Sequence, residues 1–220
     1  MHVMTALWGP CEEYIGPKVE EYIRKFASLK EGKIRLDRFK DEPIIVFSID
    51  NCHFSTEELA LDPSTKWYNF KQGSAGLKYE VAISIHHQEI MWIRGPLPAS
   101  VHDISMFRGG TGKEIKKKKV DKDAFIFQIP DGKKGVGDSG YSGEPNKIIT
   151  TRKGQSLELK QWLGRVKSRQ ETFFSRMKGF SVLKNRFRHG KRGTEDKMLR
   201  HKHCFESIAV IGPRGPGKAQ

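Results

Sequence analysis

Cysteine is scarce in this sequence, and its few copies are scattered. Cys11, Cys52 and Cys204 lie far apart. This spacing excludes both the dense disulfide framework of small secreted domains and the closely spaced ligand pairs of a zinc knuckle. A hydrophobic content of 36% is enough for a core of its own, so we expect one compact folded domain with attachments.

Long hydrophobic runs are also missing. No apolar stretch approaches the roughly 18 residues that a membrane-spanning helix requires. The N-terminus, with Glu12 and Glu13 close behind it, lacks the pattern of a signal peptide. We therefore expect a soluble, intracellular protein.

Acidic residues are too few to balance the basic ones. Lys and Arg total 40 against 26 Asp and Glu, which gives a net charge of +14. A surplus this large on a globular chain favours a polyanionic partner. Nucleic acid is the expected partner, ahead of an anionic membrane surface, and we expect no membrane association.

The run from Ile44 to Ile49 is rich in β-branched and aromatic residues and has the composition of a buried central strand. Asp50 follows directly, so we expect its carboxylate at the end of this strand. A carboxylate on a rigid strand is well placed to hold a hard cation such as Mg²⁺. The alternative is that Asp50 and Asn51 only open a turn.

Apolar periodicity and turn residues predict most of the other elements. Two strands joined as a hairpin are expected to form a meander with the first strand. A cap at Ser100 or Asp103 is expected to start a short helix ending at Phe107. The expected ranges are a helix at 17–29, strands at 77–85 and 90–94, a sheet break at 95–98, a loop at 109–123, extended pieces at 125–129 and 134–136, and helices at 156–180 and 195–210.

Two further acids occupy distinctive positions. Asp138 follows the extended piece at 134–136, between Gly137 and Gly140, which allow a tight turn and close approach of a ligand. Glu171 lies in the long helix, on the face opposite its apolar stripe. On spacing alone, an i,i+4 ion pair with a neighbouring lysine explains Glu171 equally well.

Three carboxylates brought together in space can hold two divalent cations about 3.5–4 Å apart, which is the arrangement that promotes in-line phosphodiester displacement. Without metal, like charges packed so closely repel each other. If Asp50, Asp138 and Glu171 meet in the fold, cation binding explains them better than stability does. The residues therefore indicate metal-assisted phosphodiester cleavage, without a choice between DNA and RNA.

Histidines offer two other interpretations. His102 and Asp103 would suit an acid/base pair, but a helix start explains them better. Zinc ligands would have to come from His201, His203 and Cys204 together with Cys52 and His53, at no standard spacing.

Several short motifs recur in a known order. They lie at 48–53 (SIDNCH), 68–71 (YNFK), 77–81 (LKYEV), 95–96 (GP), 100–103 (SVHD), 136–143 (VGDSGYSG), 169–172 (RQET), 176–180 (RMKGF) and 187–189 (FRH). In order and spacing, the chain resembles the DDE-type transposases, and among them the Harbinger-like and related DDE superfamily endonucleases. The resemblance covers roughly residues 43–210.

This resemblance implies an α/β, RNase H-like fold with a mixed sheet and helices on both faces. It places the catalytic domain at 43–210. Apolar periodicity predicts an N-terminal helical extension and connector at 1–42 before it, and Gly- and Pro-rich composition predicts a disordered tail at 211–220 after it. Asp50, Asp138 and Glu171 become the catalytic and metal-binding residues, for two ions of Mg²⁺ or Mn²⁺. The implied reaction is cleavage of DNA at transposon ends, followed by attack of the freed 3′-hydroxyl on target DNA.

The expected DNA contacts combine the basic face of the long helix with a basic segment that has an embedded aromatic residue, suited to phosphate contacts and stacking. They are Lys167, Lys178, Lys184, Arg186, Arg188, Lys191 and Arg192. A separate DNA-binding protein and a homodimer are further expected partners. The expected location is the nucleus in a eukaryotic host and the cytoplasm otherwise.

Two features depart from the family pattern. Asn51 follows the first acid where the family commonly has Gly, and Asn tolerates left-handed backbone geometry. The roughly 40 residues before the first strand are too few for a helical DNA-binding module plus a packing helix. A truncated copy, or a catalytic subunit that relies on another protein, is therefore expected. The alternatives are a domesticated copy that binds DNA without cutting it, and an RNase H-type enzyme that acts on RNA.

Overall fold

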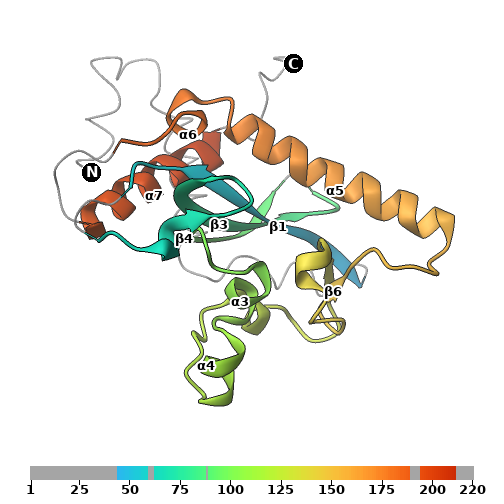
Figure 1. The fold of residues 1–220 in the computed structure, drawn as a ribbon. Helices are drawn as coiled ribbons and strands as arrows, with labels where there is room; N and C mark the ends of the chain where they lie inside the picture. Colours follow the sequence, from blue (N-terminus) through green and yellow to red (C-terminus); the bar gives the residue numbers. More distant parts are fainter. Residues whose placement is uncertain (1–43, 59–61, 88, 189–193, 212–220) are drawn as a thin grey trace, which may run out of the picture.

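The computed structural model describes residues 44–58, 62–87, 89–188 and 194–211 (Figure 1). The expected helix at 17–29 and the expected tail lie outside this part of the chain. So do Lys191 and Arg192 of the expected DNA contacts.

A mixed sheet of six strands forms the centre of the described fold. β1 pairs antiparallel with β3, and β3 pairs antiparallel with both β4 and β2, whereas β5 lies parallel to β1 and to β6. The predicted meander of β1, β3 and β4 is therefore confirmed. The strands are β1 (Ile45–Ser55), β2 (Tyr68–Asn69), β3 (Ser74–Ser84), β4 (Ile90–Pro98), β5 (Lys134–Val136) and β6 (Ile148–Ile149).

Helices cover both faces of this sheet, as predicted (Figure 1). α5 and α7 lie on one face, and α3, η3 and η4 lie on the other. No helix in the described part of the chain is long and apolar enough to cross a bilayer. The helices are η2 (Thr65–Trp67), α3 (Asp103–Arg108), α4 (Gly112–Lys116), η3 (Phe125–Phe127), η4 (Ser139–Tyr141), α5 (Leu157–Met177), α6 (Ser181–Lys184) and α7 (Thr194–Ile211).

β1 is central because its side chains are buried on both faces of the sheet. Phe47 and Ile49 pack in the cluster that contains Phe125, with the Phe47 and Phe125 ring centroids 4.9 Å apart. Cys52 and Phe54 pack in the cluster under α5 and α7. A strand buried in this way is a rigid support for any polar side chain that it carries.

α5 begins as predicted, because the Ser156 side chain accepts a hydrogen bond from the Leu159 N–H at 3.2 Å. Its apolar stripe is buried at Val166, Phe173 and Met177. The helix ends at Met177, before the expected 180, and α6 follows after a turn.

β1 is longer than predicted, and Asp50 lies inside it. The strand continues to Ser55, because Asn51 to Ser55 pair with β3. The parallel neighbour β5 is shorter, and its last pair with β1 joins Ser48 to Val136. Asp50 therefore lies just beyond the end of β5 and not at the end of its own strand.

The prediction of a sheet break at 95–98 is wrong. β4 runs through to Pro98, and Leu97 and Pro98 pair with Lys78 and Leu77. Among the described strands, β4 pairs only with β3, so its prolines lie on an edge, where a missing N–H removes no ladder hydrogen bond. A register shift between Lys78 and Glu80 accommodates the irregular segment.

Three local predictions after β4 are also wrong. His102 is the N-cap residue of α3 and makes no side-chain capping hydrogen bond, so neither Ser100 nor Asp103 caps this helix. The expected loop at 109–123 contains α4, which opens with a capping box between Thr111 and Glu114, a signal present in the sequence. The expected extended piece at 125–129 begins instead with η3, because Phe125 turns inward to pack on the sheet.

We expect Gly164→Ala to raise the free energy of unfolding by about 0.5–1 kcal/mol, because Ala is favoured over Gly inside a helix. A Cβ added at Gly164 meets nothing within 4 Å. Gly135→Ala in β5 is the contrast, since its Cβ would lie 2.0 Å from Cε2 of Phe47 and lower stability by about 1–3 kcal/mol. Urea unfolding followed by circular dichroism measures both. A destabilised Gly164→Ala variant would contradict the packing of α5.

Candidate functional site

The β1–β5 pairing places two of the predicted acids at the same level of the sheet. Ser48 pairs with Val136, and Asp50 and Asp138 each lie two residues beyond this pair. α5 crosses the sheet above β1 and brings Glu171 to the cavity that Asp50 lines. Three residues that are far apart in the sequence thus come together on two strand segments and one helix.

The pKa of the Asp50 carboxylate depends on its burial and on the other acids near it. Burial is the main cause that raises the pKa of Asp50 to about 7, and the charges of Asp138, Asp103 and Glu171 raise it further. A backbone hydrogen bond from Asn51 opposes the rise. Asp50 therefore lies within reach of three other acids, one of which was not among the predicted site residues.

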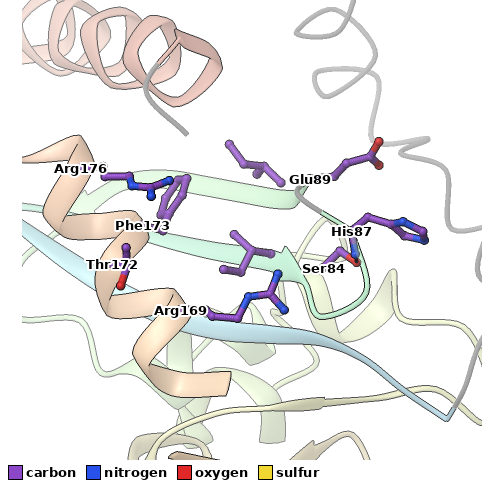
Figure 2. Close-up of a pocket in the computed structure, with 9 residues that line it drawn as sticks. Ser84, His87, Glu89, Arg169, Thr172, Phe173 and Arg176 are labelled. Carbon is purple, nitrogen blue, oxygen red and sulfur yellow. Dashed lines mark hydrogen bonds between the residues drawn. The ribbon is translucent and has the colours of Figure 1, made fainter. Parts of the chain in front are cut away.

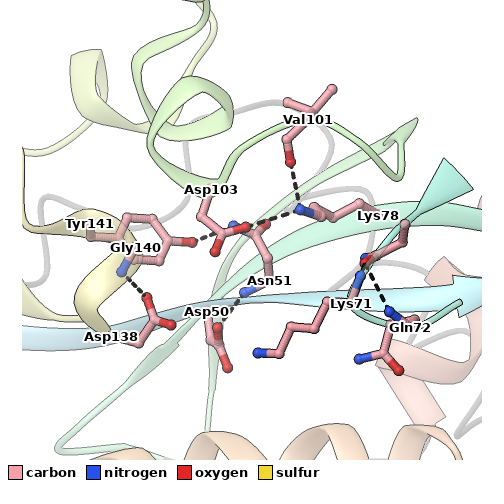
Figure 3. A network of polar contacts seen from close by, with 11 residues as sticks. Asp50, Asn51, Lys71, Gln72, Lys78, Val101, Asp103, Asp138, Gly140 and Tyr141 are labelled. Atoms are coloured by element: carbon pink, nitrogen blue, oxygen red, sulfur yellow. Dashed lines mark hydrogen bonds and ion pairs between the residues drawn. The ribbon is translucent and has the colours of Figure 1, made fainter. Parts of the chain in front are cut away.

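Backbone N–H groups hold the two aspartates (Figure 3). Asp50 Oδ1 accepts a hydrogen bond from the Asn51 N–H at 2.7 Å. Asp138 Oδ1 accepts one from the Gly140 N–H at 2.8 Å, as the N-cap of η4. The next residue, Tyr141, joins the two segments, because its hydroxyl oxygen accepts a hydrogen bond from Asn51 Nδ2 at 2.6 Å.

Asp103 is the acid that sequence reasoning missed. It lies at the first position of α3, and its Oδ1 is 3.1 Å from the Lys78 ammonium on β3. The motif at 100–103 was noted for its family resemblance, but Asp103 was interpreted as a helix cap. The family motif and the helix-cap interpretation rest on the same local sequence. Only the fold shows that Asp103 lies near Asp50 and Asp138.

Glu80 is a second acid that the sequence did not single out. It is fully buried on β3, directly across from Asn51 on β1. Burial raises its pKa to about 8, and the charge of Arg94 opposes the rise. Both carboxylate oxygens are buried, and the Trp92 side chain beside them also opposes the rise. Glu80 is therefore a neutral carboxylic acid at neutral pH, behind the segment that carries Asp50.

A cavity of about 740 Å³ opens beside Asp50 and Glu171. The end of α5 and α6 contribute a basic wall, which carries Lys178 and Lys184. Burial and then the charge of Lys178 lower the pKa of His53 to about 4. The cavity is thus lined by acidic side chains, Asp50 and Glu171, and by a basic wall, Lys178 and Lys184.

The expected DNA contacts divide into two groups. Lys178 and Lys184 line the cavity. The three others in the described part of the chain make contacts away from it. Lys167 Nζ lies 3.0 Å from Thr151 Oγ1, Arg186 Nε donates to the Thr56 carbonyl at 3.1 Å, and Arg188 Nε lies 3.8 Å from Glu57 Oε1.

The aromatic residue expected to stack on bases has another role. Phe187 is half-buried, and its ring packs edge-on against His201 with centroids 4.8 Å apart. Its backbone N–H donates to the Ser55 carbonyl at 2.9 Å, and its carbonyl accepts from the Glu57 N–H at 3.0 Å. Phe187 therefore anchors its segment to the end of β1.

A second, smaller hollow of about 250 Å³ lies on the other side of α5 (Figure 2). Thr172 and Phe173 face it, whereas Glu171 and Phe174 line the larger cavity. Basic and acidic side chains both line the smaller hollow. Arg169 and Arg176 extend from α5, and His87 and Glu89 come from the β3–β4 hairpin.

The acids suit a hard divalent cation by their chemistry. All are oxygen donors, and a cation would relieve the repulsion that contributes to the raised pKa of Asp50. Within the residues that the structure describes, however, no group of three His, Cys, Asp or Glu side chains is positioned to hold a metal ion. The carboxylates share a site, and their side chains would have to turn toward one another to share an ion.

The fold and the gathered acids together define an α/β protein of the RNase H-like type. A family model described as DDE superfamily endonuclease matches residues 49–211, which is more than half of the chain. The chain therefore belongs to the DDE superfamily endonucleases, and the resemblance inferred from the sequence is confirmed. Searches of curated proteins and of solved structures gave no match.

The pKa of Asp50 predicts how stability depends on pH without metal. Its folded-state pKa of about 7 exceeds the ordinary value of 3.8, so the folded protein binds the extra proton and becomes less stable as pH rises between these values. Asp50→Asn has no ionisable group at this position, so it should not lose this stability as pH rises. At pH 8 in EDTA we expect the variant to be more stable than wild type, by about 2–4 kcal/mol, with little difference at pH 4.

Urea unfolding at pH 4, 6 and 8 tests this expectation. Asp123→Asn, at an exposed position after α4, is the matched control. Parallel pH profiles for wild type and Asp50→Asn would show that the carboxylate is not in the repulsive environment described above.

Proposed function

We propose that this protein is a Mg²⁺- or Mn²⁺-dependent DNA endonuclease of the transposase type, which cleaves phosphodiesters at transposon ends and joins those ends to target DNA. Asp50, Asp138 and Glu171 are its catalytic and metal-binding residues. The observation that carries the proposal is the convergence of these acids, from two strand segments and a helix, around the carboxylate of Asp50. Residues 43–210 form the catalytic unit.

Asp50 and Asp138 would coordinate the cations, and Glu171 would complete the site from α5. The chemistry that bound divalent cations supply is Lewis acidity, which activates a water or a 3′-hydroxyl and stabilises both oxygens of the displacement. The protein would hold the carboxylates in position to coordinate these cations. Since Asp50 is half-protonated near pH 7 without metal, cation binding must release its proton, and affinity should rise with pH.

The basic wall of the cavity supports DNA as the substrate. A strand that crosses the cavity would place one phosphate at the carboxylates and further phosphates near Lys178 and Lys184. Recognition of a particular sequence would then come from elsewhere. A separate DNA-binding protein or a second copy of this chain would supply it, in the nucleus if the host is a eukaryote.

A nicking assay tests the proposal. We expect wild type with Mg²⁺ to nick supercoiled plasmid, and Asp50→Asn, Asp138→Asn and Glu171→Gln each to lose at least about 100-fold of this activity, because each removes a ligand charge. Glu158→Gln, an exposed change at the start of the same helix, is the control for Glu171→Gln and should nick like wild type. Nicking that persists in Asp138→Asn would exclude this assignment.

The basic wall gives a separate prediction about binding. Lys178→Ala and Lys184→Ala should each weaken DNA binding for all sequences and reduce the slope of log K against log salt by about 1, because each removes a phosphate contact. Lys113→Ala on α4, which lies away from α5 and α6, is the matched control (Figure 1). Fluorescence anisotropy at several salt concentrations measures the slope. An unchanged slope in both variants would show that DNA does not pass along this wall.

The second candidate is a transposase-derived protein that binds DNA without cutting it. The absence of a ready three-ligand metal set among the described residues favours it. It predicts salt-dependent DNA binding that needs Lys178 and Lys184, and no nicking with Mg²⁺ or Mn²⁺. The two assays above, run on one preparation, separate the two candidates.

A further inference from the structure

Asp103 belongs to a chain of contacts that reaches the segment carrying Asp138. Lys78 on β3 donates from Nζ to the Val101 carbonyl at 2.5 Å and pairs with Asp103 Oδ1 at 3.1 Å (Figure 3). The Lys78 side chain is only 12% exposed. The pair is therefore a partly buried, fixed contact and not a mobile surface ion pair.

The other oxygen of Asp103 faces Gly140. A Cβ added at Gly140 would lie 2.8 Å from Asp103 Oδ2 and 2.9 Å from Asp138 Oδ1. The two carboxylates thus flank the same residue, whose N–H holds Asp138 Oδ1. Only glycine leaves room for both, so the position of Asp103 limits where Asp138 can lie.

The Lys78 ammonium stabilises Asp103 as a fourth carboxylate beside Asp50, Asp138 and Glu171. Asp103 is close enough to Asp50 for its charge to be felt there, and two further acids surround Asp50. The ammonium of Lys78 offsets the charge of Asp103 and fixes its orientation. Asp103 is then engaged on one side by Lys78 and directed on the other at the segment that carries Asp138.

We propose that Asp103, held by Lys78, is a positioning residue that sets the Asp138 carboxylate relative to Asp50 and thereby sets the affinity of this acid group for a divalent cation. The inference rests on the proposed function. Residues that orient metal ligands typically contribute 10- to 100-fold to metal affinity. The competing explanation is that the ion pair only ties the start of α3 to β3 for stability.

The experiment measures Mn²⁺ binding to the full chain by electron paramagnetic resonance, with thermal unfolding in EDTA for each variant. Asp103→Asn keeps the shape of the side chain and removes its charge. We expect it to weaken Mn²⁺ binding by about 10- to 100-fold while its unfolding temperature stays close to that of the control. Asp103→Glu, which retains the charge, should recover part of the affinity.

Asp121→Asn is the matched control. Asp121 Oδ2 pairs with Arg94 on β4 at 2.5 Å, so this variant also removes one carboxylate charge from an ion pair with a sheet strand. Asp121 is not among the acids that act on Asp50. Its Mn²⁺ affinity should equal that of wild type.

Gly140→Ala gives a second measurement of the same contact. Its Cβ would displace both carboxylates, so we expect weaker Mn²⁺ binding in the wild-type background. In the Asp103→Ala background one of the two clashes is gone, so the same change should cost less. Such non-additivity is expected only if residues 103 and 140 act through direct contact.

The outcomes separate the two proposals. Wild-type Mn²⁺ binding that is lost in Asp138→Asn but kept in Asp103→Asn would overturn this inference alone. So would a loss in Asp103→Asn that is no larger than in Asp121→Asn, or one that only follows a drop in unfolding temperature. No Mn²⁺ binding by wild type would overturn both this inference and the proposed function.

Discussion

The buried side chain of Gln170 fixes the geometry on which the candidate site depends. Its Oε1 accepts a hydrogen bond from Ser48 Oγ at 2.8 Å, and its Nε2 donates to the Val81 carbonyl at 3.0 Å. Val81 is the cross-strand partner of Asp50. These bonds set which turn of α5 lies above β1, because an unpaired buried amide would be costly. Glu171 is the next residue, so the same bonds bring it to the cavity beside Asp50.

The site that results is electrostatically unfavourable in the free protein. Burial is the main cause that raises the pKa of Asp50 to about 7, and the charges of its three acidic neighbours raise it further. Among the described residues, no basic side chain lowers the pKa of Asp50. Lys78 pairs with Asp103, while Lys178 and Lys184 line the basic wall of the cavity. A fold that tolerates such a group is more consistent with binding cations and a polyanion than with stability alone.

Much of this arrangement could be predicted from residue patterns, and the failures have local causes. Asp50 and Asp138 stood out because each follows a strand-like run, and Asp138 also adjoins glycine, whereas Glu171 was singled out only by the family resemblance. Asp103 did not stand out, since an acid at the start of a helix has an ordinary local explanation. The extension of β4 to Pro98 was missed because proline disrupts a central strand but not an edge strand, and edge position is a property of the sheet. Glu80 was missed because strand periodicity cannot show which polar residue is covered on both sides.

By itself, the sequence determined the strands and helices with strong apolar periodicity, the excess of basic charge, and the family, because these depend on local side-chain chemistry and on motif order. Only the tertiary structure decided which acids become neighbours. That outcome depends on strand register, on the short length of β5 and on the two bonds of Gln170, all of which join residues distant along the chain. Asp103 and Lys78 meet for the same reason, since their contact exists only once α3 packs against β3.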